Sequence, residues 1–259
     1  MNRQPAVAGV FYPVNTLQLH QMLTQYLKDA ETSAKVPKAI IAPHAGYIYS
    51  GPIAASAYAR LKPARHQITR VVIIGPSHRV GFKGLAISHA DTFSTPLGKI
   101  PVDQDALATI VQFPFVTYLE QAHSHEHSLE VHLPFLQVTL NDFSIIPIVA
   151  GDATPDQVGQ VLEKLWGGDE TLIVISSDLS HYLDYAAANK LDQLTSDIIE
   201  NKQYELLTPD LACGKVPVSG LLKVAREKSL TLKTIDLRNS GDTAGDKARV
   251  VGYGAYVTD

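Results

Sequence analysis

The sequence has few of the features that mark secreted, membrane-spanning or nucleic-acid-binding proteins. It contains one cysteine, Cys213, which excludes an internal disulfide and fits a reducing cytoplasm. No apolar run approaches the ~20 residues of a membrane span, and the N-terminal stretch lacks the apolar segment of a signal peptide. The formal net charge is −4 and no basic stripe is present, so neither nucleic acid nor a membrane is an expected partner.

What the sequence does contain is an alternation of apolar, β-branched runs with helical spacings, unbroken by a repeat or a linker. Strands are expected at 38–43, 70–76, 84–89, 143–151, 171–178, 230–237 and 248–257. Helices are expected at 19–27, 51–61, 103–112, 126–140, 155–166, 184–200 and 217–228. The pattern predicts one α/β domain over residues 1–259, a three-layer α/β/α sandwich around a mixed sheet.

The ends of the apolar runs are the expected place of a ligand, because ligands of α/β sheets bind beyond the carboxyl ends of the strands. Histidines follow three of these runs, at His44, His78 and His181. A single histidine at such a place usually caps or hydrogen-bonds locally. However, His44 and His78 both lie in tight Gly/Pro turns, and neutral imidazole is a good ligand for zinc, iron and copper. We therefore predict that these two side chains contact a metal or a substrate.

The third strand end carries both Asp178 and His181. Asp178 or Ser180 would suit the N-cap of the helix at 184–200, and this interpretation is compatible with a functional one. An imidazole near a metal is a natural general base, because its unperturbed pKa lies near neutrality. We predict that His181 points into a pocket and acts there as the acid/base.

The densest group of histidines is HSHEHSLEVH at 123–132. It is not the HExxH zinc motif, because Leu129 occupies the position of the second histidine. One interpretation is a solvated first helical turn with acidic residues near the helix dipole. The other is a pocket wall in which His127, Glu130 and His132 orient ligands or substrate, and both interpretations stay open.

Two further segments offer ligand atoms. Cys213, in LACGKVPVSG, follows apolar residues and has no local signature of a nucleophile, so we expect a structural role at the pocket. NSGDTAGD at 239–246 offers the carboxylates of Asp242 and Asp246 to a metal, and a plain turn is the alternative.

Seven motifs, in chain order, resemble the Memo family: VAGVFYP, PHAGYIYSG, GPSHR, EHSLEVHLPFL, SSDLSHY, ACGKVPVSGLL and VVGYGAY. Together they are highly specific and cover nearly the whole chain. The family is similar to the LigB-type extradiol dioxygenases, which use non-haem Fe(II) on an α/β/α scaffold. The resemblance therefore implies a LigB-like fold and a divalent metal, Fe(II) in the first place, with zinc or copper as alternatives.

The motifs also imply individual roles. His44 and His78 match the first two metal-site histidines, His181 matches the acid/base histidine of the dioxygenases, and Asp178 matches the aspartate before it. At the third ligand the sequence departs from the pattern: the dioxygenases have a glutamate and the animal Memo proteins a cysteine.

We align that third position near Gly241, which offers no ligand. Asp242 is the nearest carboxylate and is the predicted third ligand of a 2-His-1-carboxylate site, with Asp246 as the second choice.

Two functions of different classes follow from these observations. The first is a metal-dependent oxidoreductase of the extradiol type, and the second is a binding or adaptor protein that uses the pocket for a metal, a peptide or a partner. The retained Asp178 and His181 favour the enzyme, the missing third ligand favours the adaptor, and a zinc hydrolase ranks third. Prokaryotic relatives resemble one part of a three-protein set, which implies AMMECR-type and radical-SAM partners beside a small-molecule or peptide ligand.

Overall fold

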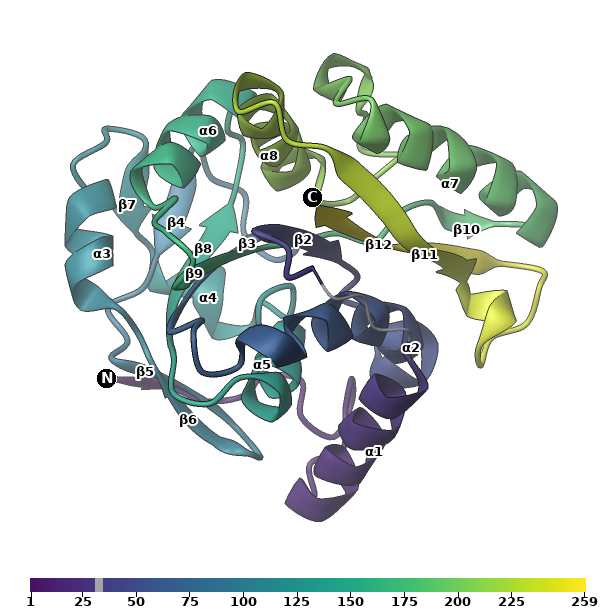
Figure 1. Ribbon diagram of the computed structural model, residues 1–259, viewed down its shortest axis with the longest axis horizontal. Coiled ribbons are helices and arrows are strands. Elements are labelled where there is room, and N and C mark those ends of the chain that lie inside the picture. The colour runs from purple at the N-terminus through teal and green to yellow at the C-terminus, as the bar shows by residue number, and fades with distance from the viewer. Residues whose placement is uncertain (31–34) are drawn as a thin grey trace.

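The long apolar runs form the middle of a nine-stranded mixed sheet in a computed structural model that describes residues 1–30 and 35–259 (Figure 1). In spatial order its strands are β10 (His181–Leu183), β12 (Val250–Thr258), β2 (Ala39–Ala42), β9 (Thr171–Ser176), β3 (Arg70–Pro76), β8 (Ser144–Ala150), β4 (Leu85–Ile87) and β7 (Val116–Tyr118). β11 (Leu232–Asn239) also pairs with β12. The four central strands from β2 to β8 are parallel, whereas β12 and β4 join them antiparallel.

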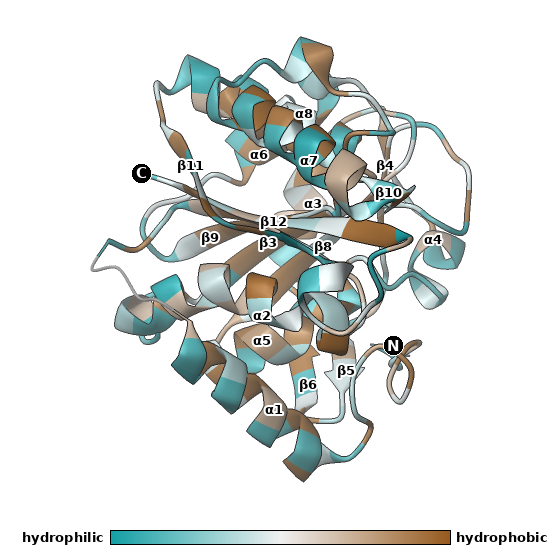
Figure 2. Ribbon diagram, turned by 90° about the vertical axis from the view of Figure 1, so that its right-hand side faces the viewer, coloured by the Kyte–Doolittle hydropathy of each residue, from teal (hydrophilic) through white to brown (hydrophobic). Residues whose placement is uncertain are grey.

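Helices cover both faces of this sheet (Figure 2). One face carries α1 (Thr16–Asp29), α2 (Tyr47–Tyr58) and α5 (Leu133–Thr139), and the other carries α6 (Pro155–Lys164), α7 (Tyr185–Glu200) and α8 (Lys215–Glu227). Shorter elements are α3 (Gln104–Ile110), α4 (Glu120–Ser124) and a small sheet of β1 (Asn2–Arg3), β5 (Thr92–Thr95) and β6 (Gly98–Pro101). The predicted three-layer α/β/α architecture with a mixed sheet is confirmed.

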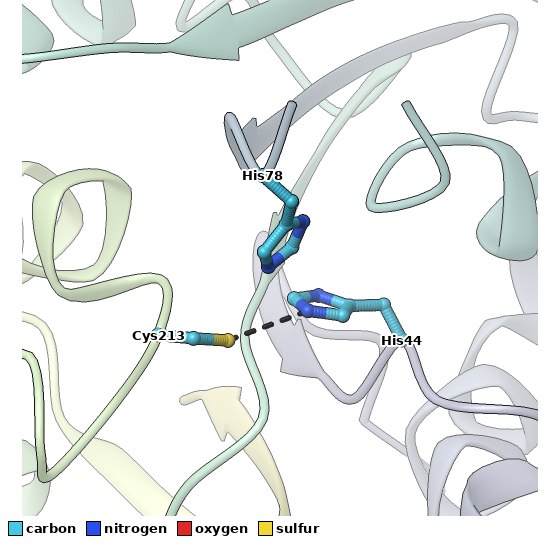
Figure 3. Close-up of side chains that lie close together, drawn as sticks. All are labelled: His44, His78 and Cys213. Carbon is cyan, nitrogen blue, oxygen red and sulfur yellow. Dashed lines mark hydrogen bonds between the residues drawn. The ribbon is translucent and has the colours of Figure 1, made fainter. Parts of the chain in front are cut away.

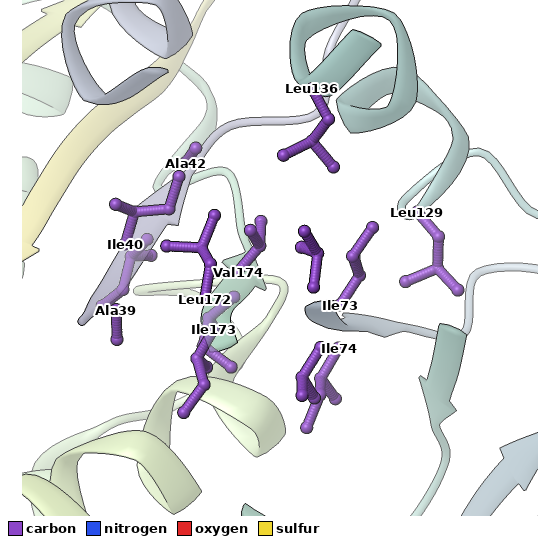
Figure 4. Close-up of a cluster of buried hydrophobic side chains, with 14 of the residues drawn as sticks. Ala39, Ile40, Ala42, Ile73, Ile74, Leu129, Leu136, Leu172, Ile173 and Val174 are labelled. Atoms are coloured by element: carbon purple, nitrogen blue, oxygen red, sulfur yellow. The ribbon is translucent and has the colours of Figure 1, made fainter. Parts of the chain in front are cut away.

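The central strands are apolar on both faces because both faces are covered. Figure 4 shows Ile73 and Ile74 of β3 pointing to opposite sides of the sheet, with Leu129 and Leu136 over one side. All four side chains are buried. Burial of such side chains contributes about 1.5–3 kcal/mol each, and the rigid sheet that results fixes the positions of the turns that follow its strands.

The expected helix at 126–140 is the largest local difference from the sequence prediction. The structure has a turn, then a 3₁₀ helix (Glu130–His132) and then α5. The reason lies in Glu126, whose carboxylate accepts the backbone N–H groups of His127 and Ser128. A side chain that binds these N–H groups competes with helix formation. Within residues 1–30 and 35–259, no helix is long and apolar enough to cross a membrane.

Candidate metal centre

Three parallel strands end at one cavity of about 660 Å³. β2 is followed by His44, β3 by His78, and β9 by the segment that holds Asp178 and His181. All four residues line the cavity. The other wall residues include six that are aromatic or basic: Phe11, Tyr49, Arg79, Tyr182, Arg249 and Tyr253.

The side chains of His44, His78 and Cys213 come from distant parts of the chain and converge beside this cavity (Figure 3). The ligand atoms of His44, His78 and Cys213 all lie within 4.8 Å of one another, and Cys213 Sγ is 3.3 Å from His44 Nε2. Zinc–nitrogen and zinc–sulfur bonds of about 2.1 and 2.3 Å would put two such ligands roughly 3.1 Å apart at a right angle and roughly 3.6 Å apart at the tetrahedral angle. The spacing of the sulfur and the nitrogen therefore matches two ligands of one ion.

Hydrogen bonds determine which nitrogen of His44 is free to bind. Ser176 Oγ donates its single proton to the carbonyl of Ser128, at 2.6 Å. It must therefore accept from its other two neighbours, which are His44 Nδ1 at 2.6 Å and His132 Nε2 at 2.8 Å. His44 consequently carries its proton on Nδ1 and presents a bare Nε2 to the cavity. Such supporting bonds commonly fix the tautomer of a metal-binding histidine.

His78 is oriented by the carboxylate of Glu126, which accepts its Nδ1–H at 2.9 Å and its backbone N–H at 2.6 Å. Burial alone would raise the pKa of Glu126, but these hydrogen bonds outweigh burial and lower the pKa to about 2. The carboxylate is therefore ionised and engaged with four N–H groups, counting those of His127 and Ser128. His78 Nε2 is left bare, like that of His44.

The third member of the group is a thiol. Burial, with a further contribution from Asp178, raises the pKa of Cys213 to about 12, so the metal-free thiol is protonated. A coordinated metal deprotonates a thiol outright. Two imidazoles and a thiolate suit zinc, copper and iron better than magnesium or calcium. The residues present thus fit the divalent metal that the resemblance implies.

Asp242, the predicted third ligand, does not face this cavity. Its two carboxylate oxygens accept the hydroxyl of Tyr185 and the backbone N–H of Asn239, so it caps the 3₁₀ turn Ser240–Asp242. The prediction is therefore wrong, and its second choice, Asp246, does line the cavity. Cys213, for which the sequence predicts a structural role, lies with its sulfur close to the two histidines across 169 residues of chain, which makes it a candidate ligand.

Asp178 is buried beside the centre, and its Oδ1 accepts the backbone N–H of His44 at 2.8 Å. Burial raises the pKa of Asp178 to about 6, against the lowering effect of that hydrogen bond and of nearby imidazoles. It does not cap α7, since Asp184 does so. Its role is to hold the turn that presents His44.

His181 lies on the exposed side of the cavity, and a hydrogen bond to the main chain fixes the orientation of its ring. A backbone carbonyl can only accept, so His181 Nδ1 donates to Leu179 O at 2.8 Å, and this hydrogen bond leaves Nε2 unengaged. The neighbouring Tyr182 has φ 61°, a left-handed conformation that is uncommon for a bulky residue. This unusual backbone coincides with the cavity wall, where Tyr182 packs beneath the guanidinium of Arg249.

The three candidates from the run at 123–132 separate in the structure. His127 lines the cavity and stacks on His78, with ring centroids 4.7 Å apart, and burial lowers its pKa to about 4. His132 lies behind the cavity, where it donates to Ser176 Oγ and receives the hydroxyl of Tyr58.

Glu130 is not a pocket residue. It is buried and anchors the N-terminal segment by accepting from the Arg3 guanidinium, the Tyr12 hydroxyl and the N–H groups of Ala6 and Val7. Sequence reasoning also missed Ser176 and the orienting role of Glu126. A serine at the end of a buried strand was the available signal for Ser176.

The buried histidines make stability dependent on pH. Burial lowers the pKa of His123 to about 4, below the ~6.5 of an unfolded histidine. Its contribution is therefore fully present above pH ~6.5 and is lost as pH falls towards 4. When the pH is lowered from 7.5 to 5.0, the free energy of unfolding should fall in both proteins. Measured by urea unfolding, the fall should be about 2 kcal/mol smaller in His123→Gln than in the native protein. The exposed His20, changed to Gln, is the matched control and should leave the pH dependence unaltered. An equal loss in all three proteins would contradict the assignment.

Comparison with known proteins identifies the family of the chain and agrees with its fold. A profile of the Memo-like protein family matches residues 3–257. A MEMO1 family protein of Aquifex aeolicus is 36% identical over 263 residues, covering 97% of each chain, and one of Methanosarcina mazei is 37% identical over 270 residues, covering 99% of each.

The fold alone is shared with an uncharacterised protein of Escherichia coli K12, JW3007. Its crystal structure has a TM-score of 0.53 and 14% identity, covering 85% of this chain and 99% of that one. Given the family match over nearly the whole length and relatives above one third identical, the chain belongs to the Memo-like protein family.

Proposed function

We propose that the chain is a metal-dependent oxidoreductase that holds Fe(II) between His44, His78 and Cys213. One observation carries the proposal: two imidazoles with bare Nε2 atoms and a thiol converge within 4.8 Å of one another beside a cavity that holds a further histidine. Zinc and copper suit the same donors, so the identity of the metal is part of the test.

When bound, Fe(II) supplies the chemistry with O₂ that amino-acid side chains lack. Residues of the chain would accept the proton and hold the metal-binding histidines in place. His181 Nε2 would take the proton of a substrate hydroxyl, because Nδ1 is committed to Leu179 O. Asp178 and Ser176 would keep His44 in place, and Glu126 would do so for His78.

The walls of the cavity favour an aromatic substrate with an anionic group. Tyr49 and Tyr182 offer ring faces, and Arg79 and Arg249 offer guanidinium groups that bind carboxylates in a bidentate manner. The lining also contains two carboxylates, those of Asp178 and Asp246, and Asp178 is buried. We therefore infer a carboxylated catechol as the substrate class.

The test combines metal analysis of anaerobically purified protein with oxygen uptake. Iron-loaded protein should consume oxygen with carboxylated catechols, and less with the same catechols lacking the carboxylate. Arg249→Gln should lower kcat/KM for the carboxylated compounds by about tenfold or more and leave the uncharged ones unchanged. Failure to bind metal, or no oxygen uptake across the panel, would count against the proposal.

One observation favours the alternative, a binding or adaptor protein. Tyr182 is 64% exposed at the cavity wall, and an exposed aromatic ring suits recognition of a peptide or partner. In that case Tyr182→Ala would abolish binding of the partner while the His44, His78 and Cys213 group kept its metal. AMMECR-type and radical-SAM proteins are the partners to test first.

A further inference from the structure

A second cavity, of about 350 Å³, approaches the same centre on the Cys213 side. It lies beyond the carboxyl ends of β3 and β8 and is closed by the segment that leads into α8. Its walls are mainly apolar, with Pro76, Val80, Phe82 and Val216 among them. Cys213 lines this second cavity, whereas the lining of the main cavity includes His44 and His78 but not Cys213.

The sulfur therefore lies between two separate hollows. Figure 3 shows Cys213 reaching His44 from its own side of the centre, with His78 above. The Sγ atom is 3.3 Å from His44 Nε2, so anything that reaches the sulfur through the second cavity arrives within contact distance of the centre. The Cys213 residue is also partly exposed, which requires a path from solvent.

The linings of the two cavities differ in character. The main cavity carries two guanidinium groups, those of Arg79 and Arg249, and two carboxylates, those of Asp178 and Asp246. The second cavity has one carboxylate and one ammonium, those of Asp152 and Lys215, among mainly apolar residues. The arginines of the main cavity can pair with a charged ligand, whereas the apolar walls of the second favour a small uncharged one.

We propose that the second cavity is a separate entrance, through which a small uncharged molecule reaches Cys213 without passing the main cavity. The proposal goes beyond the proposed function, because it requires no bound metal. It gives the centre two faces: one for a charged substrate and one for a small neutral molecule.

The lone cysteine makes the test direct, because any alkylated thiol is Cys213. Metal-free protein is treated with iodoacetamide or iodoacetate, which differ in charge but little in size, and the rates are normalised to those of free cysteine.

Two variants narrow the second cavity. Gly81→Leu is tolerated because a Cβ there meets no atom within 4 Å, and Val216→Trp enlarges a residue already in the wall. The control is Gly46→Leu in the main cavity, where a Cβ makes only ordinary contacts, the shortest 3.6 Å.

We expect normalised labelling by iodoacetamide to exceed that by iodoacetate, and both narrowing variants to slow it by about tenfold or more, since thiol reactivity follows access. Gly46→Leu should leave the rate within about twofold of the native one. A slower rate in Gly46→Leu alone, or a preference for iodoacetate, would overturn the proposal by placing the path in the main cavity. Unchanged rates in all variants would overturn it too, and circular dichroism checks the fold of each. Protection of Cys213 by added Fe(II) or Zn²⁺ is a separate result that tests the proposed function alone.

Discussion

His181→Gln is expected to keep both fold and metal while lowering turnover by roughly 10²–10⁴-fold, the usual contribution of a positioned acid/base. The side chain lies in the cavity wall, is exposed, and is not one of the three converging ligand groups. Its loss should therefore leave the centre intact and remove only the proton acceptor. Oxygen uptake by the iron-loaded variant, with metal content measured on the same sample, checks this.

A matched control is His125→Gln, an exposed histidine outside the main cavity, which should turn over like the native protein. Full activity in His181→Gln would rule out His181 as the base. Altered affinity for a partner, with no oxygen uptake by the native protein on any catechol tested, would favour the adaptor alternative instead.

The second large effect is expected on metal affinity in Cys213→Ser. A hydroxyl replaces the soft thiol of the proposed third ligand. Removal of a direct ligand should cost more than the 10–100-fold typical of supporting residues, so we expect metal affinity to fall by about 100-fold or more. His44→Ala should behave similarly. Both effects can be measured by anaerobic titration with Fe(II) or Co(II), with circular dichroism to confirm that each variant is folded.

Asp242→Asn is the informative control for this series. Its carboxylate is engaged by Tyr185 and Asn239, away from the cavity, so the variant should keep native metal affinity. Loss of metal in Asp242→Asn together with retention in Cys213→Ser would reverse the ligand assignment and restore the carboxylate site that the sequence suggests.

The fold could be predicted largely because its strands are buried on both faces. β3 and β9 are long apolar runs, and the histidines or polar turns that follow them mark the functional edge of the sheet. Short strands such as β5, β6 and β10 escaped prediction, because three or four residues carry no readable period. Two of them also pair with distant segments, β5 with β1 and β10 with β12.

The same contrast between local sequence and distant packing applies to the site. His44 and His78 could be found from their local context at strand ends, whereas Cys213 could not, because its proximity to His44 is produced by the packing of α8 and not by neighbouring residues. Ser176 and Glu126 were missed for a related reason. Their importance lies in the hydrogen bonds they accept from the histidines, and a sequence pattern does not display such bonds.

The place of β12 in the sheet bears on how the protein is made. β12 is the last of the sheet strands to be synthesised, yet it pairs with β2, β10 and β11. Its Gly252 exchanges backbone hydrogen bonds with Leu179 and Ser180, next to His181. The segment that carries His181 therefore lacks these backbone partners until β12 has left the ribosome. The His181 side of the cavity should therefore be among the last parts of the fold to form during translation.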